Sequence, residues 1–158
     1  TNLTIWYEHW FSTLKEYSPD KKTILKTFFV ISNKYLYNRK YTMDITEKYF
    51  NLMINFTDSI GGDSSVYEMT TQSMNYYPIS SYNKVKLNIL SLKICLKTRD
   101  EEKIEYHYNE LNKNIKEFPS ENKTENEYLK YFIEQAILET TDADLINWCK
   151  NALEKLNH

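Results

Sequence analysis

The sequence predicts an all-α protein with about eight helices in antiparallel hairpins, arranged as a compact bundle or short α-solenoid. Only two of the 158 residues are glycine, whereas folds built on tight hairpin turns need many more. Apolar residues recur at intervals of three and four along almost the whole chain, which is the period of a helix. Capping and turn residues occupy the breaks between these runs. Because a chain of this length forms one sizeable core, we expect a single helical domain over residues 1–158.

Four helices are expected in the first half of the chain. Their apolar stripes are Leu3, Trp6, Trp10, Leu14 and Tyr17; Ile24, Leu25, Phe28, Ile31, Tyr35 and Leu36; Tyr49, Phe50, Met53, Phe56 and Ile60; and Tyr67 and Met74. The expected ends of these helices are marked by capping and turn residues: Ser18-Pro19, Asp20, Asp44, Gly61, the capping box of Ser65 and Glu68, and Pro78. The segments 27–32 and 35–37 are rich in β-formers and are the places where a strand would compete.

Four more helices are expected in the second half. Tyr82, Val85, Ile89, Leu92 and Leu96 form one stripe of the first, and Leu87, Leu90 and Ile94 form another, which predicts a central helix. The short connection Arg99-Asp100 predicts an antiparallel hairpin with the next helix. The remaining stripes are Ile104, Tyr108, Leu111, Ile115 and Phe118; Tyr128, Phe132, Ala136 and Ile137; and Leu145, Trp148, Cys149, Ala152 and Leu156. Thr124 with Glu127 is expected to open the third of these four helices, and Thr141 or Asp142 to cap the last.

Several classes of function conflict with this composition. Phosphate-binding loops, the dinucleotide fingerprint and the nucleophile elbow all need several glycines at fixed spacing. No spacing of His, Cys and acidic residues matches a zinc, calcium or di-iron site, so we expect neither metal nor cofactor. The isoelectric point near 5.9 and the presence of only two arginines disfavour nucleic-acid binding. No apolar run is long enough for a membrane helix, and the segment at Thr1 lacks the pattern of a signal peptide.

The cysteines and histidines give no strong catalytic pattern. Cys95 and Cys149 fall on apolar helix faces and are expected to be core thiols in a reducing compartment. Of the three histidines, His107 has the most polar helical surroundings, but Glu105 is two residues away and points elsewhere, so the two are not a preassembled dyad. We therefore expect a binding role and no enzyme activity.

Charge is distributed unevenly along the chain. Residues 99–158 carry fourteen acidic residues against eight basic ones, whereas residues 1–48 carry five against eight. This acidic half predicts a surface that attracts a basic protein partner. Two tyrosines in the segment before Pro78 are further interface candidates because tyrosine buries area and keeps a polar tip. The candidate partner-binding residues are Glu101, Glu102, Glu105, Glu121, Glu125, Glu127, Tyr76 and Tyr77.

In size, all-helical pattern, acidity and lack of a signal segment, the whole chain resembles the small helical immunity proteins that neutralise interbacterial, contact-dependent nuclease toxins. That class shares no motif. The resemblance implies a cytoplasmic protein that occludes a toxin, with carboxylates such as Glu101, Glu105 and Glu125 pairing with the Lys and Arg that a nuclease uses to hold phosphate.

Two other functions remain open at the level of sequence. One is a helical scaffold, adaptor or viral decoy that binds a peptide in an aromatic groove. The other is a helical enzyme whose site assembles around His107. An exposed groove of Tyr and Phe would favour the first, and a deep polar pocket holding His107 and a carboxylate would favour the second.

Overall fold

A computed structural model describes residues 9, 12–13, 16, 67–68, 70–71 and 79–158 of the chain. These residues form four helices and no strand: α5 (Ser81–Thr98), α6 (Glu101–Ile115), α7 (Lys123–Glu139) and α8 (Ala143–Leu156). The all-α class is confirmed in this part of the chain. The count of about eight helices is wrong, because the described residues support four.

The excess in the expected count comes from the first half of the chain. The four apolar runs expected there, together with Gly61, the 27–32 and 35–37 segments and most of the capping residues, lie outside the described residues. The eight described positions before residue 79 have helical backbone, but they are isolated residues and define no helix ends. The chain divides into two compact units, Thr1–Asn83 and Lys84–His158, and the single domain over 1–158 stays a prediction.

The α5 helix is buried around its whole circumference. Val85, Leu87, Ile89 and Leu92 are all completely buried, so both expected apolar stripes are confirmed, with only Leu96 half-buried. Polar side chains share this environment: Asn83, Lys86, Asn88 and Ser91. The ammonium group of Lys86 lies 5.1 Å from the centre of the Phe132 ring in α7, a cation–π distance that offsets part of the cost of burying the charge.

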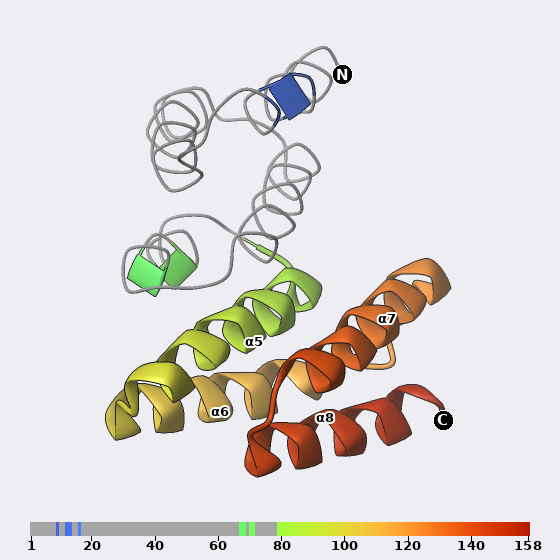
Figure 1. Cartoon of the computed structure of the whole chain (residues 1–158). Helices are drawn as coiled ribbons and strands as arrows, with labels where there is room; N and C mark the ends of the chain where they lie inside the picture. The colour runs from blue at the N-terminus through green and yellow to red at the C-terminus, as the bar shows by residue number, and fades with distance from the viewer. Residues whose placement is uncertain (1–8, 10–11, 14–15, 17–66, 69, 72–78) are drawn as a thin grey trace. The chain divides into compact units, whose positions relative to one another are not determined.

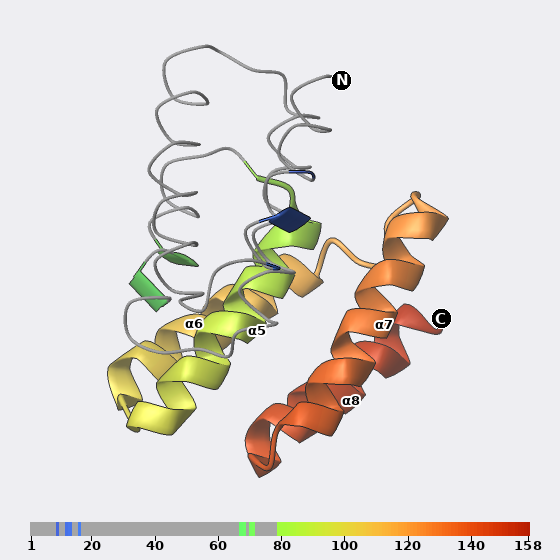
Figure 2. The same ribbon diagram turned by 45° about the horizontal axis from the view of Figure 1, so that its top comes forward.

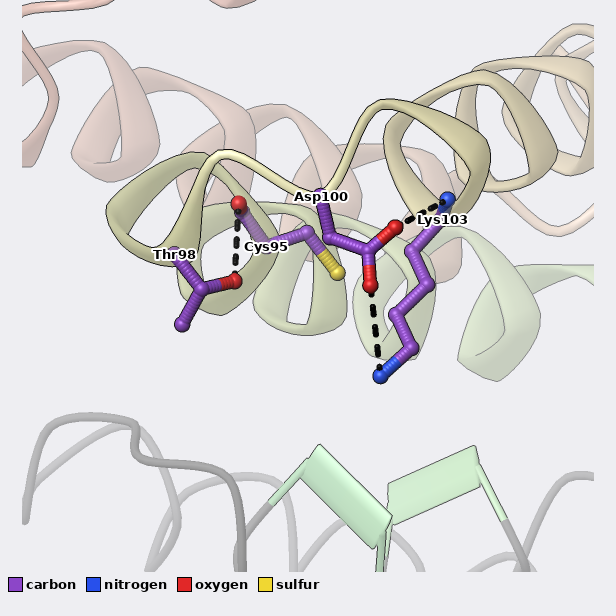
Figure 3. A network of polar contacts seen from close by, with 4 residues as sticks. All are labelled: Cys95, Thr98, Asp100 and Lys103. Atoms are coloured by element: carbon purple, nitrogen blue, oxygen red, sulfur yellow. Dashed lines mark hydrogen bonds and ion pairs between the residues drawn. The ribbon is translucent and has the colours of Figure 1, made fainter.

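The connection between α5 and α6 forms a tight antiparallel turn. Arg99 has a φ of 56° and occupies the left-handed position that usually takes glycine at a helix end. The N–H of Asp100 then donates to the Cys95 carbonyl at 3.4 Å. The Thr98 hydroxyl donates to the same carbonyl at 3.2 Å (Figure 3). The expected hairpin is confirmed, and α5 and α6 lie side by side in Figures 1 and 2.

Asp100 begins α6 as its N-cap, and its carboxylate accepts from the Lys103 N–H at 3.3 Å. Along α6 the expected stripe is partly right, since Leu111 and Phe118 are buried whereas Ile104, Tyr108 and Ile115 are half-buried. The other buried positions are polar: His107 and Asn114. Two polar residues therefore occupy part of the buried face of α6, where apolar residues would be usual.

The start of α7 differs from the expectation. Its N-cap is Asn122, whose side chain accepts from the Glu125 N–H at 3.1 Å, and Thr124 lies inside the helix. Asn126 holds the preceding loop against the helix by accepting from the Ser120 N–H at 2.9 Å and donating to the Ser120 carbonyl at 2.8 Å. Asn and Thr both serve as N-caps, and these loop contacts favour the earlier start.

The buried face of α7 is rotated relative to the predicted one. Leu129 and Ile133 are completely buried and Ala136 is 1% exposed, whereas Phe132 is half-buried and Tyr128 is 63% exposed. The assignment of Tyr128 to the core is therefore wrong. The core stripe starts one residue later, at Leu129.

The last helix, α8, packs against α7 and also contacts α6 (Figure 1). Its buried residues are Leu145, Cys149 and Ala152, with Trp148 and Leu156 half-buried. The Trp148 indole donates to Asn112 at 2.9 Å, and the Lys155 ammonium donates to the carbonyl of Ile115 at 3.0 Å. The same carbonyl accepts from the Phe118 N–H at 3.0 Å, and a cation at this point stabilises the end of α6 by interacting with the negative end of the helix dipole.

Asp142 is the N-cap of α8, which confirms one of the two expected candidates. Its side chain accepts from the Leu145 N–H at 2.8 Å. We predict that Asp142→Ala lowers the free energy of unfolding by about 1 kcal/mol, because an N–H at the helix start loses its acceptor. Urea unfolding followed by circular dichroism measures this, with Asn147→Ala at an exposed position of α8 as the control. An Asp142→Ala protein as stable as the parent would show that the cap contributes nothing.

Candidate protein-binding surface

The first two turns of α6 present carboxylates to solvent. Glu101, Glu102 and Glu105 are all exposed. Lys103 lies among them, and its ammonium group is 3.6 Å from the carboxylate of Asp100 (Figure 3). Residues 100–106 hold four acidic residues and one lysine, which gives a formal charge of −3.

An aromatic side chain lies within this charged segment. Tyr106 is 52% exposed, one turn after Glu102 and next to Glu105 in the chain. The exposure of Tyr106 was not predicted from the sequence, because tyrosine fits both a core and an interface position. We call Glu101, Glu102, Glu105 and Tyr106 the α6 acidic surface.

The other predicted glutamates lie elsewhere. Glu121 precedes α7, and Glu125 and Glu127 lie in its first turns, with Glu125 half-buried. The fifteen residues of α6 separate them from its N-terminus, a length of about 22 Å. The structure therefore places the predicted acidic residues in two groups at opposite ends of α6. Tyr76 and Tyr77 lie outside the described residues.

A second exposed feature is the outer face of α7. Its large apolar side chains, Tyr128, Tyr131 and Leu138, are 63%, 64% and 77% exposed. Tyr131 and Leu138 are seven residues apart, and Tyr128 is one turn before Tyr131, so they follow one side of the helix. The sequence does indicate an exposed apolar face on α7, because the apolar residues of this helix fit two stripes. Only one of the two stripes is buried.

His107 is a buried structural group. It has no solvent exposure, and its Nδ1 lies 2.8 Å from Oδ1 of Asn88 in α5. The Nδ2 of Asn88 donates to the carbonyl of Lys84 at 2.8 Å, which orients the amide so that Oδ1 accepts from the imidazole N–H. Burial, with a smaller contribution from Lys103, lowers the pKa of His107 to about 4, so the ring is neutral at neutral pH. The enzyme hypothesis calls for a deep polar pocket that holds His107 together with a carboxylate, whereas the group at hydrogen-bond distance from Nδ1 is the Asn88 amide.

Both cysteines lie in the core, as predicted, and neither forms a disulfide. Burial raises the pKa of Cys149 to about 12, which keeps its thiol protonated and unreactive. Among the described residues, no group of three or more His, Cys, Asp and Glu side chains is placed to hold a metal ion. The helices of the same part of the chain are too short or too polar to cross a membrane.

Comparisons with protein-family models, with curated proteins and with solved structures gave no match for this chain. Function is therefore inferred from the residues and their geometry, above all from the α6 acidic surface and the outer face of α7.

Proposed function

We propose that this chain is a protein-binding module that holds a basic partner on the α6 acidic surface. The observation that carries the proposal is the combination of an exposed aromatic ring, Tyr106, with three exposed glutamates in the same two turns of α6. Each of these features alone is common on a protein surface. Together they provide an anchor and a charge pattern that fit one kind of partner.

The two features contribute differently to binding. Tyrosine buries a large area at a low cost in side-chain entropy, and tyrosines are enriched among the residues that dominate interface energies. Carboxylates accept charge-assisted hydrogen bonds from Lys and Arg, and they speed the encounter with a positively charged surface. The expected partner therefore presents an apolar recess for Tyr106 surrounded by basic side chains.

In its finer form the proposal is an immunity-type function in the cytoplasm, with a nuclease-like toxin as the partner. A nuclease holds phosphate with Lys and Arg, so a surface that pairs with those side chains occludes the substrate site. Glu125 belongs to this finer form as a second contact, at the other end of α6.

The test is affinity capture of partners from cell extract, analysed by mass spectrometry, with parent and variant proteins as bait. Glu101→Gln/Glu105→Gln and Tyr106→Ala are each expected to lower recovery of a basic partner at least tenfold, and added salt should weaken capture by the parent. Glutamine avoids placing positive charge at the helix N-terminus, where it is unfavourable. Circular dichroism checks that each variant is folded.

The matched control is Glu117→Gln/Glu154→Gln, which removes two exposed carboxylates away from the surface. It should capture the partner as the parent does. If the control lost as much capture as the surface variants, the loss would come from the change in net charge and not from the α6 acidic surface. Unchanged capture by both surface variants would refute the proposal.

A further inference from the structure

The outer face of α7 carries a pattern of charge that its apolar residues do not explain. Beside Tyr131 and Leu138, one edge of the helix holds Lys123, Glu127, Lys130 and Glu134 at intervals of four, three and four residues. The signs alternate along this edge.

The order of charges along this edge is self-complementary: when the edge is read in the opposite direction, each lysine is matched by a glutamate and each glutamate by a lysine. Lys123 and Glu134 lie at equal distances from the point between Tyr128 and Leu129, and so do Glu127 and Lys130. When two copies of one helix pack antiparallel about a two-fold axis, the same edge of each helix faces its counterpart. With the axis at this point, each lysine faces a glutamate of the other copy.

The four charged groups are available for such contacts. Lys123, Glu127 and Glu134 are exposed and Lys130 is half-buried, and none of them forms an ion pair with another described residue. Glu139, by contrast, is engaged within the fold, since its carboxylate lies 2.6 Å from the ammonium group of Lys93 in α5. Within the described part of the chain, the four charges of this edge thus have no ion-pair partner, whereas Glu139 is paired with Lys93.

We propose that a second copy of this chain packs antiparallel on the outer face of α7. Tyr128 and Tyr131 of both copies lie around the two-fold axis, Leu138 lies at the periphery, and the alternating edge forms two kinds of ion pair, each made twice. A basic partner fits this face less well, because Lys123 and Lys130 would repel it. The proposal is independent of the α6 acidic surface.

The size of the face sets the strength of the association. Stable complexes bury about 800 Å² on each partner, and one face of a seventeen-residue helix offers less. The dimer is therefore expected to dissociate on dilution, and the two ion-pair sets act mainly on specificity and register.

Sedimentation equilibrium of the full chain over a range of concentrations tests the proposal, with two charge-swapped variants. Glu127→Lys/Glu134→Lys makes the edge wholly positive, and Lys123→Glu/Lys130→Glu makes it wholly negative. Each variant alone should dimerise at least tenfold more weakly than the parent because the copies repel each other. A one-to-one mixture of the two should regain the parent's association, which a misfolded variant would not do.

Tyr131→Ala serves as a second, uncharged variant and is also expected to weaken dimerisation at least tenfold. A parent that stays monomeric at every concentration overturns the proposal. This outcome is also the one expected if a different protein, and not a second copy, occupies the outer face of α7. Association of both charge-swapped variants at the parent's strength, or a mixture that does not regain association, overturns it as well.

Discussion

Lowering the pH from 7 to 4 is expected to destabilise the fold by about 3 kcal/mol through His107 alone. The imidazole is completely buried and donates to Asn88, and its pKa is lowered from 6.5 to about 4. Each unit of pKa difference between folded and unfolded chains corresponds to about 1.4 kcal/mol at 25 °C. Because the folded protein favours the neutral ring, this stability is fully present above pH 6.5. It is lost as the pH falls from 6.5 towards 4.

Urea unfolding of the parent and of His107→Gln across this pH range isolates the contribution. Glutamine stays neutral across this pH range, whereas all other titrating groups are common to both proteins. The variant should lose less stability than the parent between pH 7 and pH 4, by about 3 kcal/mol. Parallel pH curves for the two proteins would contradict a buried, neutral His107.

Leu129→Ala is expected to cost 2–5 kcal/mol, about the range measured for cutting a fully buried leucine to alanine. Leu129 is completely buried on the inner face of α7, so the variant loses both buried area and packing contacts. Leu138 lies on the same helix and is 77% exposed. Leu138→Ala should therefore change the free energy of unfolding by less than about 0.5 kcal/mol.

This pair of variants is matched in residue type and helix, so the comparison measures burial directly. Chemical denaturation at low protein concentration keeps any association through the outer face of α7 from contributing. Similar losses for Leu129→Ala and Leu138→Ala would mean that the buried face of α7 is assigned incorrectly.

Local features of the second half were predictable from sequence because strong signals act over short distances. The two apolar stripes of α5 lie on different sides of the helix and predicted burial on both, and the two-residue connection at Arg99 allowed only a tight hairpin. Asp142 was one of two candidates for the cap of α8, and the structure selects it. In each case the sequence left few alternatives.

The buried face of α7 and the first residue of this helix were harder to predict, because the same residues fit two different buried faces and two different N-caps. Tyr128 and Leu129 are neighbours and both continue an apolar spacing of three and four, so the pattern does not show which of them faces the core. Tyrosine tolerates exposure better than leucine, and the structure exposes Tyr128. Asn122 and Thr124 are likewise both capping types, and contacts of Asn126 with Ser120 accompany the earlier start.

The expected count of helices exceeds the described one because the four apolar runs of the first half lie outside the described residues. Apolar periodicity indicates a helix when another element buries the apolar face. In the second half, cap contacts at Asp100, Asn122 and Asp142 fix the helix starts. The runs of the first half lie outside the described residues, so the helix ends expected there stay predictions.

For the candidate surface, the sequence predicted the exposure of the glutamates in the first turns of α6 but not the aromatic residue among them. Glu101, Glu102 and Glu105 are exposed as expected, since glutamates in a first turn face solvent and interact favourably with the helix dipole. Tyr106 was missed, although its exposure is what distinguishes this group from an ordinary charged helix start. The burial of His107 depends on Asn88, nineteen residues away, and no local pattern shows that contact.

Site-specific photocrosslinking tests the central claim, that a basic partner binds the α6 acidic surface, most directly. A photoreactive amino acid with an aromatic ring, such as p-azidophenylalanine, replaces Tyr106 in one protein so that a ring is kept at this position, and it replaces Asn151, an exposed residue of α8, in a control. We expect that a basic protein crosslinks to position 106 in cell extract, that added salt reduces this crosslink, and that position 151 does not capture the same protein. No crosslink at position 106, or the same proteins captured from both positions, would contradict it.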